Sequence, residues 1–237
     1  MPIGDIKLVL LDVYGTLLDM GHVEKRVNEL LNSKRGYVYW FELFMQYCFV
    51  DNCIDRFNDF NSIAKSTLQM SARTFRVSLT DEDISGIFEL MKQLPIKNDV
   101  TKGLSKINDH RLRIAALTNS PEAIVIARME RTGLISFFEK VLSTEHVGKY
   151  KPDKSVYTWA AATLGLKPEE IIMVSIHDWD LAGAANAGMM TGFIQQNNQL
   201  FYPLISKPDF GSKNLNDFAN QITASIDEFN SKSLLNV

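Results

Sequence analysis

Two kinds of hydrophobic pattern follow each other along the chain. Short apolar runs that end at polar or glycine positions are typical of buried strands. Such runs occur at 6–11, 112–119, 140–144, 170–175 and 191–195. The run at 191–195 is the last strand that the sequence predicts. Helices are predicted between the later runs, at 120–133, 156–164 and 181–187. Because strands that alternate with helices form right-handed βαβ crossovers, this order predicts an α/β fold with a doubly wound parallel sheet.

Residues 20–98 interrupt this alternation. Apolar side chains recur there at helical intervals, as in Trp40, Phe44 and Cys48, and no strand-like run is closed by a Gly or Pro turn. Thr80 is a suitable N-cap for a further helix at 81–94. The sequence therefore predicts a core made of residues 1–19 and 99–237, with residues 20–98 inserted after the first strand as a helical cap over the edge of the sheet.

Composition and charge narrow the class of protein. The chain has 237 residues, of which 46% are hydrophobic and 22% charged, and this suits a globular core with a smaller companion. Its net charge of −3 and its lack of a Lys/Arg run argue against nucleic acid or an anionic membrane surface as a partner. No apolar stretch is long enough to span a bilayer and no signal peptide is visible, so we expect a cytoplasmic protein. The cysteines, Cys48 and Cys53, are expected to be buried hydrophobic side chains.

Polar side chains follow each of the first four predicted strands. A doubly wound sheet brings the carboxyl ends of such strands to one crevice, where these folds bind ligands. Two carboxylates that meet there stay ionised only if a cation lies between them, and Lys151 is the candidate cation. This arrangement suits nucleophilic catalysis by a carboxylate. The side chains are Asp12 and Thr16 after the first strand, Thr118, Asn119 and Ser120 after the second, Lys151 after the third, and Ser175, His177 and Asp180 after the fourth.

These residues also have purely structural interpretations. Asp12 could cap the turn that follows it, and Lys151 could be a solvated loop lysine. His177 could be a hydrogen-bonded surface histidine, and Tyr157 could belong to the core. The aromatic side chains at 37–49 are more typical of a packing face, and they would line a dry pocket only if the cap closed over Asp12.

Four short motifs carry a resemblance to a known family. "DVYGTL" from Asp12, the pair Thr118-Asn119, "KPD" from Lys151, and Asp180 followed closely by Ala-Gly-Ala resemble, in order, the motifs of the haloacid dehalogenase superfamily. This resemblance implies a Rossmann-like core and places the helical insertion where that superfamily has its cap. Within the superfamily the motifs look most like the L-2-haloacid dehalogenase (type II) group, whose members displace halide from a 2-haloacid and then hydrolyse the resulting ester.

The resemblance implies a role for each matching residue. Asp12 would be the nucleophile and would form a covalent aspartyl ester with a small organic acid such as a 2-haloacid. Lys151 would pair with Asp12, while Ser175 and Asp180 would orient the lysine and the hydrolytic water. The catalytic set is then Asp12, Thr16, Lys151, Ser175, His177 and Asp180, and the substrate-binding set is Tyr14, Thr118, Asn119 and Tyr157.

Two positions depart from the pattern of that group. His177 stands where the group usually has Asn, and an imidazole can take up a proton near neutral pH. The group also carries an arginine near the first cap helix that binds the substrate carboxylate and the departing halide. The corresponding stretch here, "VYWFELFMQY", contains no arginine, although Arg35 and Arg56 flank it.

The sequence leaves two alternatives to a dehalogenase-like hydrolase. A phosphatase of the same superfamily would need an acid two residues after the nucleophile and Mg²⁺ held by carboxylates, but Tyr14 and Ile176 occupy those places. A catalytically silent relative would explain the missing arginine but has no need of a buried nucleophile. We therefore expect no metal or other cofactor, with Mg²⁺ required only by the phosphatase. The expected partner is a small-molecule substrate, and a homodimer is left open.

Overall fold

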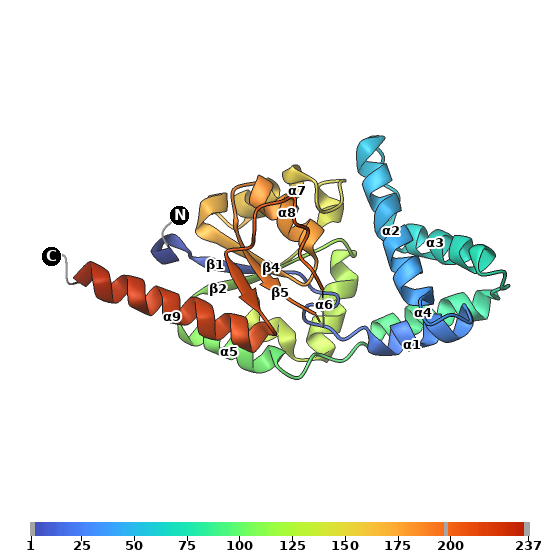
Figure 1. The fold of residues 1–237 in the computed structure, drawn as a ribbon, viewed down its shortest axis with the longest axis horizontal. Helices are drawn as coiled ribbons and strands as arrows, with labels where there is room; N and C mark the ends of the chain where they lie inside the picture. The colour runs from blue at the N-terminus through green and yellow to red at the C-terminus, as the bar shows by residue number, and fades with distance from the viewer. Residues whose placement is uncertain (1–2, 197–198, 235–237) are drawn as a thin grey trace.

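The core of the molecule is a six-stranded parallel sheet (Figure 1). The computed structural model describes residues 3–196 and 199–234. In spatial order the strands are β3 (Lys140–Ser143), β2 (Arg113–Thr118), β1 (Leu8–Leu11), β4 (Ile171–Ser175), β5 (Met190–Ile194) and β6 (Phe210–Ser212). The order of the strands along the chain reverses between β1 and β4, so a ligand crevice is expected at their carboxyl ends. The predicted α/β fold with a doubly wound parallel sheet is confirmed.

Helices cover both faces of the sheet (Figure 1). All four residues of β1 are fully buried, and they alternate between the two faces as the pleat of a strand requires. Leu8 and Leu10 pack on the side of α7 (Lys154–Thr163) and α8 (Asp178–Asn186). Val9 and Leu11 pack on the other side, which α5 (Val100–Asp109), α6 (Glu122–Arg131) and α9 (Leu215–Leu234) cover. Burial on both faces explains why the strands are continuous apolar runs.

Four helices between β1 and α5 form a separate group beside the sheet, at the end away from both chain termini (Figure 1). They are α1 (Gly21–Leu30), α2 (Gly36–Cys53), α3 (Phe60–Thr74) and α4 (Asp81–Lys92). The predicted cap residue of α4 is present, because Thr80 Oγ1 accepts a hydrogen bond from the Asp83 backbone N–H at 3.1 Å and the Asp83 carboxylate accepts one from the Thr80 N–H. Leu18 pairs with Ile96, so the two connections to the sheet lie side by side.

One strand and two α-helices of the structure lie where the sequence analysis predicted no element. The strand at 191–195 is not the last one, because β6 follows β5 and pairs with it. β6 is only three residues long and has Gly211 at its centre, so it carries no apolar run. Helices α5 and α9 pack against each other, and each buries only one stripe of side chains, such as Leu104 and Phe218.

Two further sequence expectations concern the surface and the cysteines. Within the described residues, no helix is both long and apolar enough to cross a membrane. Both cysteines are free thiols, as expected, but only Cys48 is buried. Cys53 is exposed because it lies at the last residue of α2, where the helix ends in solvent, so the expectation that both cysteines are buried was wrong.

Candidate active site

Asp12 lies immediately beyond β1, at the crevice between β1 and β4. Its backbone N–H donates to the Val174 carbonyl at 3.0 Å, which extends the pairing of the two strands up to the carboxylate. The chain then turns sharply at Gly15, where φ is +77°. This left-handed backbone favours glycine, and a Cβ at Gly15 would in addition lie 2.6 Å from Ile176 Cδ1 in the loop after β4.

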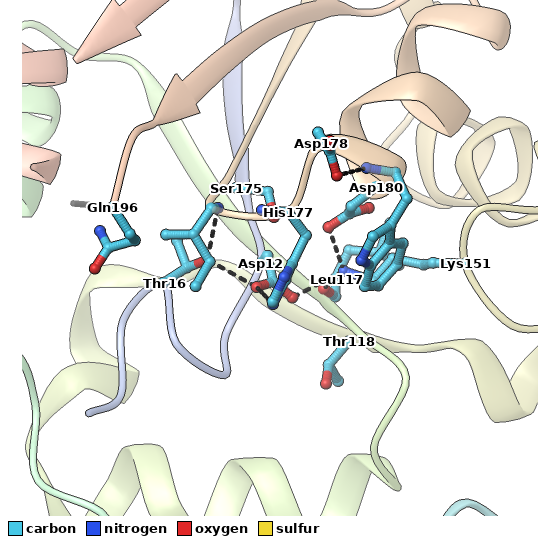
Figure 2. Close-up of polar contacts among 12 residues, drawn as sticks. Asp12, Thr16, Leu117, Thr118, Lys151, Ser175, His177, Asp178, Asp180 and Gln196 are labelled. Carbon is cyan, nitrogen blue, oxygen red and sulfur yellow. Dashed lines mark hydrogen bonds and ion pairs between the residues drawn. The ribbon is translucent and has the colours of Figure 1, made fainter. Parts of the chain in front are cut away.

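Lys151 joins the two carboxylates of the site (Figure 2). Its Nζ donates to Asp12 Oδ1 at 2.9 Å, to Asp180 Oδ2 at 2.8 Å and to the Leu117 carbonyl at 3.0 Å. The lysine is 1% exposed, which excludes its interpretation as a solvated loop residue. The other Asp12 oxygen, Oδ2, accepts from Thr16 Oγ1 at 2.7 Å, so the carboxylate bonds to side chains instead of capping the turn.

Burial and charge set the protonation of this cluster. Burial alone would raise the pKa of Asp12, but the charge of Lys151, that of His177 when the imidazole is protonated, and the hydrogen bonds from Lys151 and Thr16 outweigh it, so the pKa of Asp12 is lowered. Burial raises the pKa of Asp180 despite its contact with Lys151. Burial would lower the pKa of Lys151, but the two carboxylates outweigh this and raise it. Asp12 and Lys151 are therefore an ionised pair at neutral pH.

Tyr157 holds Asp180 in place through hydrogen bonds. Its hydroxyl donates to Asp180 Oδ1 at 2.7 Å and to the Asp180 carbonyl at 2.9 Å. Tyr157 is fully buried and does not line the cavity in front of Asp12, although the sequence placed it among the substrate-binding residues. Its side chain orients Asp180, which in turn holds the ammonium of Lys151.

The loop after β4 brings an imidazole to Asp12. His177 Nε2 lies 3.9 Å from Asp12 Oδ2, and the ring is stacked between Phe41 and Trp179, with centroid distances of 5.4 and 5.0 Å. Ser175 Oγ accepts from the His177 backbone N–H at 3.0 Å and so shapes this loop. Burial lowers the pKa of His177 below its usual value, and therefore the imidazole is neutral at neutral pH.

The carboxylate of Asp12 faces a small cavity of about 50 Å³. Three of the four predicted substrate-binding residues, Tyr14, Thr118 and Asn119, line it together with Lys151 and His177. Asn119 Oδ1 accepts from the Lys151 backbone N–H at 2.9 Å, which leaves the Asn119 amide nitrogen as the donor. Thr118 Oγ1 accepts from the Ser120 N–H at 3.1 Å, and the Tyr14 hydroxyl donates to Ser120 Oγ at 3.3 Å.

The remaining wall of the cavity is apolar and comes mainly from the four-helix group. The aromatic residues of α2 contribute to it, although the sequence favoured a packing face for them. Their helical spacing is compatible with a packing face and with a cavity wall, and only their contact with the core distinguishes these two roles. Trp179 was also missed, although its position between His177 and Asp180 was a signal. The apolar lining consists of Met20, Tyr37, Trp40, Phe41, Phe44, Met45, Phe60, Met91 and Trp179.

The donor set around Asp12 does not fit a divalent cation. Among the residues that the structure describes, no three His, Cys, Asp or Glu side chains are grouped so that they could hold a metal ion. The ammonium of Lys151 lies between Asp12 and Asp180, where a cation bridging the two carboxylates would bind. Tyr14 and Ile176 contribute no carboxylate.

Fold and site together define an α/β protein with a buried, ionised carboxylate at the carboxyl edge of its sheet and an apolar helical group above it. The chain belongs to the haloacid dehalogenase-like hydrolase family, whose model matches residues 6–188, and it is therefore a hydrolase by family.

Individual relatives agree with this assignment. An (S)-2-haloacid dehalogenase of Pseudomonas sp. (strain YL) is 27% identical over 207 residues, which cover 86% of this chain and 89% of the relative. A structure of L-2-haloacid dehalogenase from Xanthobacter autotrophicus with chloropropionic acid covalently bound has a TM-score of 0.81 at 22% identity, covering 92% of this chain and 98% of that one. A predicted phosphoglycolate phosphatase from Haemophilus somnus has a TM-score of 0.70 at 17% identity, with the same coverage. At these identities the two structures show the shared fold alone.

Proposed function

We propose that this protein hydrolyses a carbon–halogen bond, or a bond to a similar leaving group, in a small organic acid such as a 2-haloacid, through a covalent ester of Asp12. One observation carries the proposal. The side chain of Asp12 is 8% exposed, and its carboxylate faces a largely apolar cavity and is held ionised by Lys151 at 2.9 Å and Thr16 at 2.7 Å. A fixed, poorly hydrated carboxylate is an effective nucleophile toward carbon.

The first step is a displacement. An oxygen of Asp12 forms a bond to the substrate carbon while the bond from that carbon to the halogen breaks, and the halide leaves with the electron pair. Lys151 and Thr16 keep the carboxylate aimed at the cavity. Trp179, Phe41 and the other apolar side chains exclude water that would compete as a nucleophile.

The second step hydrolyses the ester. A water adds to the Asp12 carboxyl carbon and gives a proton to His177, whose imidazole is neutral and whose Nε2 lies 3.9 Å from Asp12 Oδ2. The intermediate then expels the product alkoxide, which takes the proton back from His177 and leaves as a hydroxy acid. The carboxylic acid of Asp12 loses its remaining proton to solvent, because its pKa is lowered.

Substrate size and charge follow from the cavity. Among the described residues that line it, Lys151 is the only lysine or arginine, and its ammonium already contacts two carboxylates. The substrate carboxylate would instead be bound by neutral donors, chiefly the Asn119 amide. We propose that residues 20–98, which contain α1–α4, act as a cap that selects the substrate, and that its aromatic lining favours a compact acid with an apolar substituent.

A substrate panel tests the proposal. Purified protein is incubated with 2-halo acids and with phosphate esters, each with Mg²⁺ and with a chelator, and release of halide and phosphate is measured. We expect halide release that the chelator does not change, and no release by Asp12→Asn, because an amide is a far weaker nucleophile than a carboxylate. Phosphate release that needs Mg²⁺ would replace this function by that of a phosphatase, and no turnover of any member would favour a silent relative.

A further inference from the structure

A second cleft, of about 690 Å³, lies between α6 of the core and helices α3 and α4 of the four-helix group. Four of the side chains that line it carry a positive charge, namely Lys65 from α3, Lys92 from α4, and Arg128 and Arg131 from α6. No acidic residue is found among the described residues that line it. Phe88, Ile124 and Ala127 provide apolar walls. The cleft thus combines positive charge with an apolar surface.

Arg128 is the unusual member of this set. It is only 6% exposed, and its Nε and Nη1 atoms have no hydrogen-bond partner in the described part of the chain. Burial, and after it the charge of Arg131, lower the pKa of Arg128 to about 10, so the guanidinium is still charged at neutral pH. A buried charge without a partner is costly, and in native structures an ordered water, an ion or a ligand usually supplies that partner.

The ring of Tyr14 does not replace that partner. The Arg128 guanidinium carbon lies 5.1 Å from the centre of this ring, which is a cation–π distance. A ring can stabilise only the face of a guanidinium, however, whereas its N–H groups point outward in the plane and need acceptors.

The other three cations already have partners. Lys65 lies 3.9 Å from Asp81, and Lys92 lies 2.5 Å from Glu89, in exposed ion pairs. Arg131 Nη2 donates to the Leu94 carbonyl at 2.9 Å. With these two lysines paired, the positive charge that the cleft offers to a ligand is that of Arg128 and Arg131.

We propose that this cleft binds a small organic anion, with its carboxylate at Arg128 and its apolar body against Phe88 and Ile124. The site is separate from the catalytic cavity, and Tyr14 stands between them, lining that cavity and stacking on Arg128. Because its walls come from both α6 and the four-helix group, a bound anion holds these two parts of the molecule together.

Calorimetric titration of the full chain with hexanoate tests this site. Hexanamide, which has the same apolar body without the charge, is the control ligand. Arg128→Gln removes the charge, and Ala127→Trp fills the cleft from a position that does not line the catalytic cavity. Arg73→Gln is the matched control, since Arg73 is an exposed arginine of α3 that does not line the cleft.

We expect hexanoate to bind at a single site, about tenfold or more tightly than hexanamide, since a charge-assisted hydrogen bond is lost with the amide. Arg128→Gln should weaken hexanoate by a similar factor, Ala127→Trp should abolish its binding, and Arg73→Gln should change nothing. No binding by the unmodified protein, equal binding of the two ligands, or binding that survives Ala127→Trp would overturn the proposal. If Arg128→Gln fails to fold, the Ala127→Trp variant and the comparison of hexanoate with hexanamide still test the proposal. If hexanoate bound in the catalytic cavity instead, its binding would survive Ala127→Trp. The loss of binding in Ala127→Trp therefore tests the second cleft independently of the proposed activity.

Discussion

At the scale of single residues, the chemistry of the site depends on one ammonium. Lys151 lies between Asp12 and Asp180, and without it two buried carboxylates would face each other. Burial favours the protonated form of a carboxylic acid, so removing Lys151 reverses the balance that now lowers the pKa of Asp12.

Lys151→Ala should therefore lower kcat/KM sharply at neutral pH and allow partial recovery at higher pH. In this variant, Asp12 must lose its proton before it can attack the substrate. Because its pKa is raised, it loses that proton only as the pH rises. Lys149→Ala is the matched control, because Lys149 bonds to Asp55 and Asn52 outside the site. A rate loss that is equal at every pH would show that Lys151 acts on the substrate directly.

His177 predicts a second pH effect. The pKa of His177 in the folded protein is lowered below the usual 6.5. Above that pKa the imidazole is neutral and can act as the base. As the pH falls through the pKa, the imidazole takes up a proton and the base is lost. The kcat of the native protein should decline in that range. His177→Asn should lose this decline and lower kcat at neutral pH by about 10²-fold, the contribution typical of a general base. It should still release halide in a burst equal to the enzyme concentration, because displacement needs no base. An unchanged acid limb in the variant would exclude His177 as that base.

At the scale of the elements, close packing of α8 on the Lys151 loop sets the position of the ammonium. A Cβ at Gly183 would lie 2.6 Å from both the Pro152 carbonyl oxygen and Tyr157 Cε2. These atoms belong to the backbone next to Lys151 and to the side chain that holds Asp180, so a methyl group at position 183 displaces the site itself.

We expect Gly183→Ala to lower the free energy of unfolding by about 1–3 kcal/mol, as overpacking does, and to lower kcat as well. Gly86→Ala is the matched control: Gly86 also lies within a helix, but a Cβ there meets nothing within 4 Å. That change should raise the free energy of unfolding by about 0.5–1 kcal/mol and leave kcat unchanged. Urea unfolding and steady-state kinetics measure both. Equal effects of the two substitutions would contradict the tight contact of α8.

The strands that the sequence predicted are those whose burial leaves a continuous apolar run. β1 and β4 are buried on both faces, and each reads as a strand without further context. β6 has three residues at the edge of the sheet, of which only the polar Ser212 is buried, and it is stabilised by pairing with β5, so its sequence carries no comparable signal. The buried stripe of α9, which includes Phe218, was overlooked because the prediction ended at the last apolar run.

At the scale of the whole molecule, the crevice between β1 and β4 assembles residues that are far apart in sequence. The topology of a parallel sheet made it possible to predict that Asp12, Lys151 and Asp180 meet. The cavity wall could not be predicted in the same way, because helical spacing does not tell whether Phe41 packs inside the helical group or faces Asp12. The position of Tyr157 beneath Asp180 likewise depends on the packing of α7 on α8.

The central claim is that Asp12 itself supplies an oxygen atom to the product, and oxygen-18 labelling tests it most directly. The protein, in molar excess over a 2-haloacid that the panel shows to be turned over, is allowed a single turnover in water enriched in oxygen-18. Mass spectrometry then compares the hydroxy acid with the peptide of residues 8–25, which contains Asp12 between two lysine cleavage sites. The ester mechanism predicts an unlabelled product and a label on Asp12, because water adds to the carboxyl carbon of the aspartate. A labelled product with an unlabelled Asp12 would show that water attacks the substrate directly and would contradict the account.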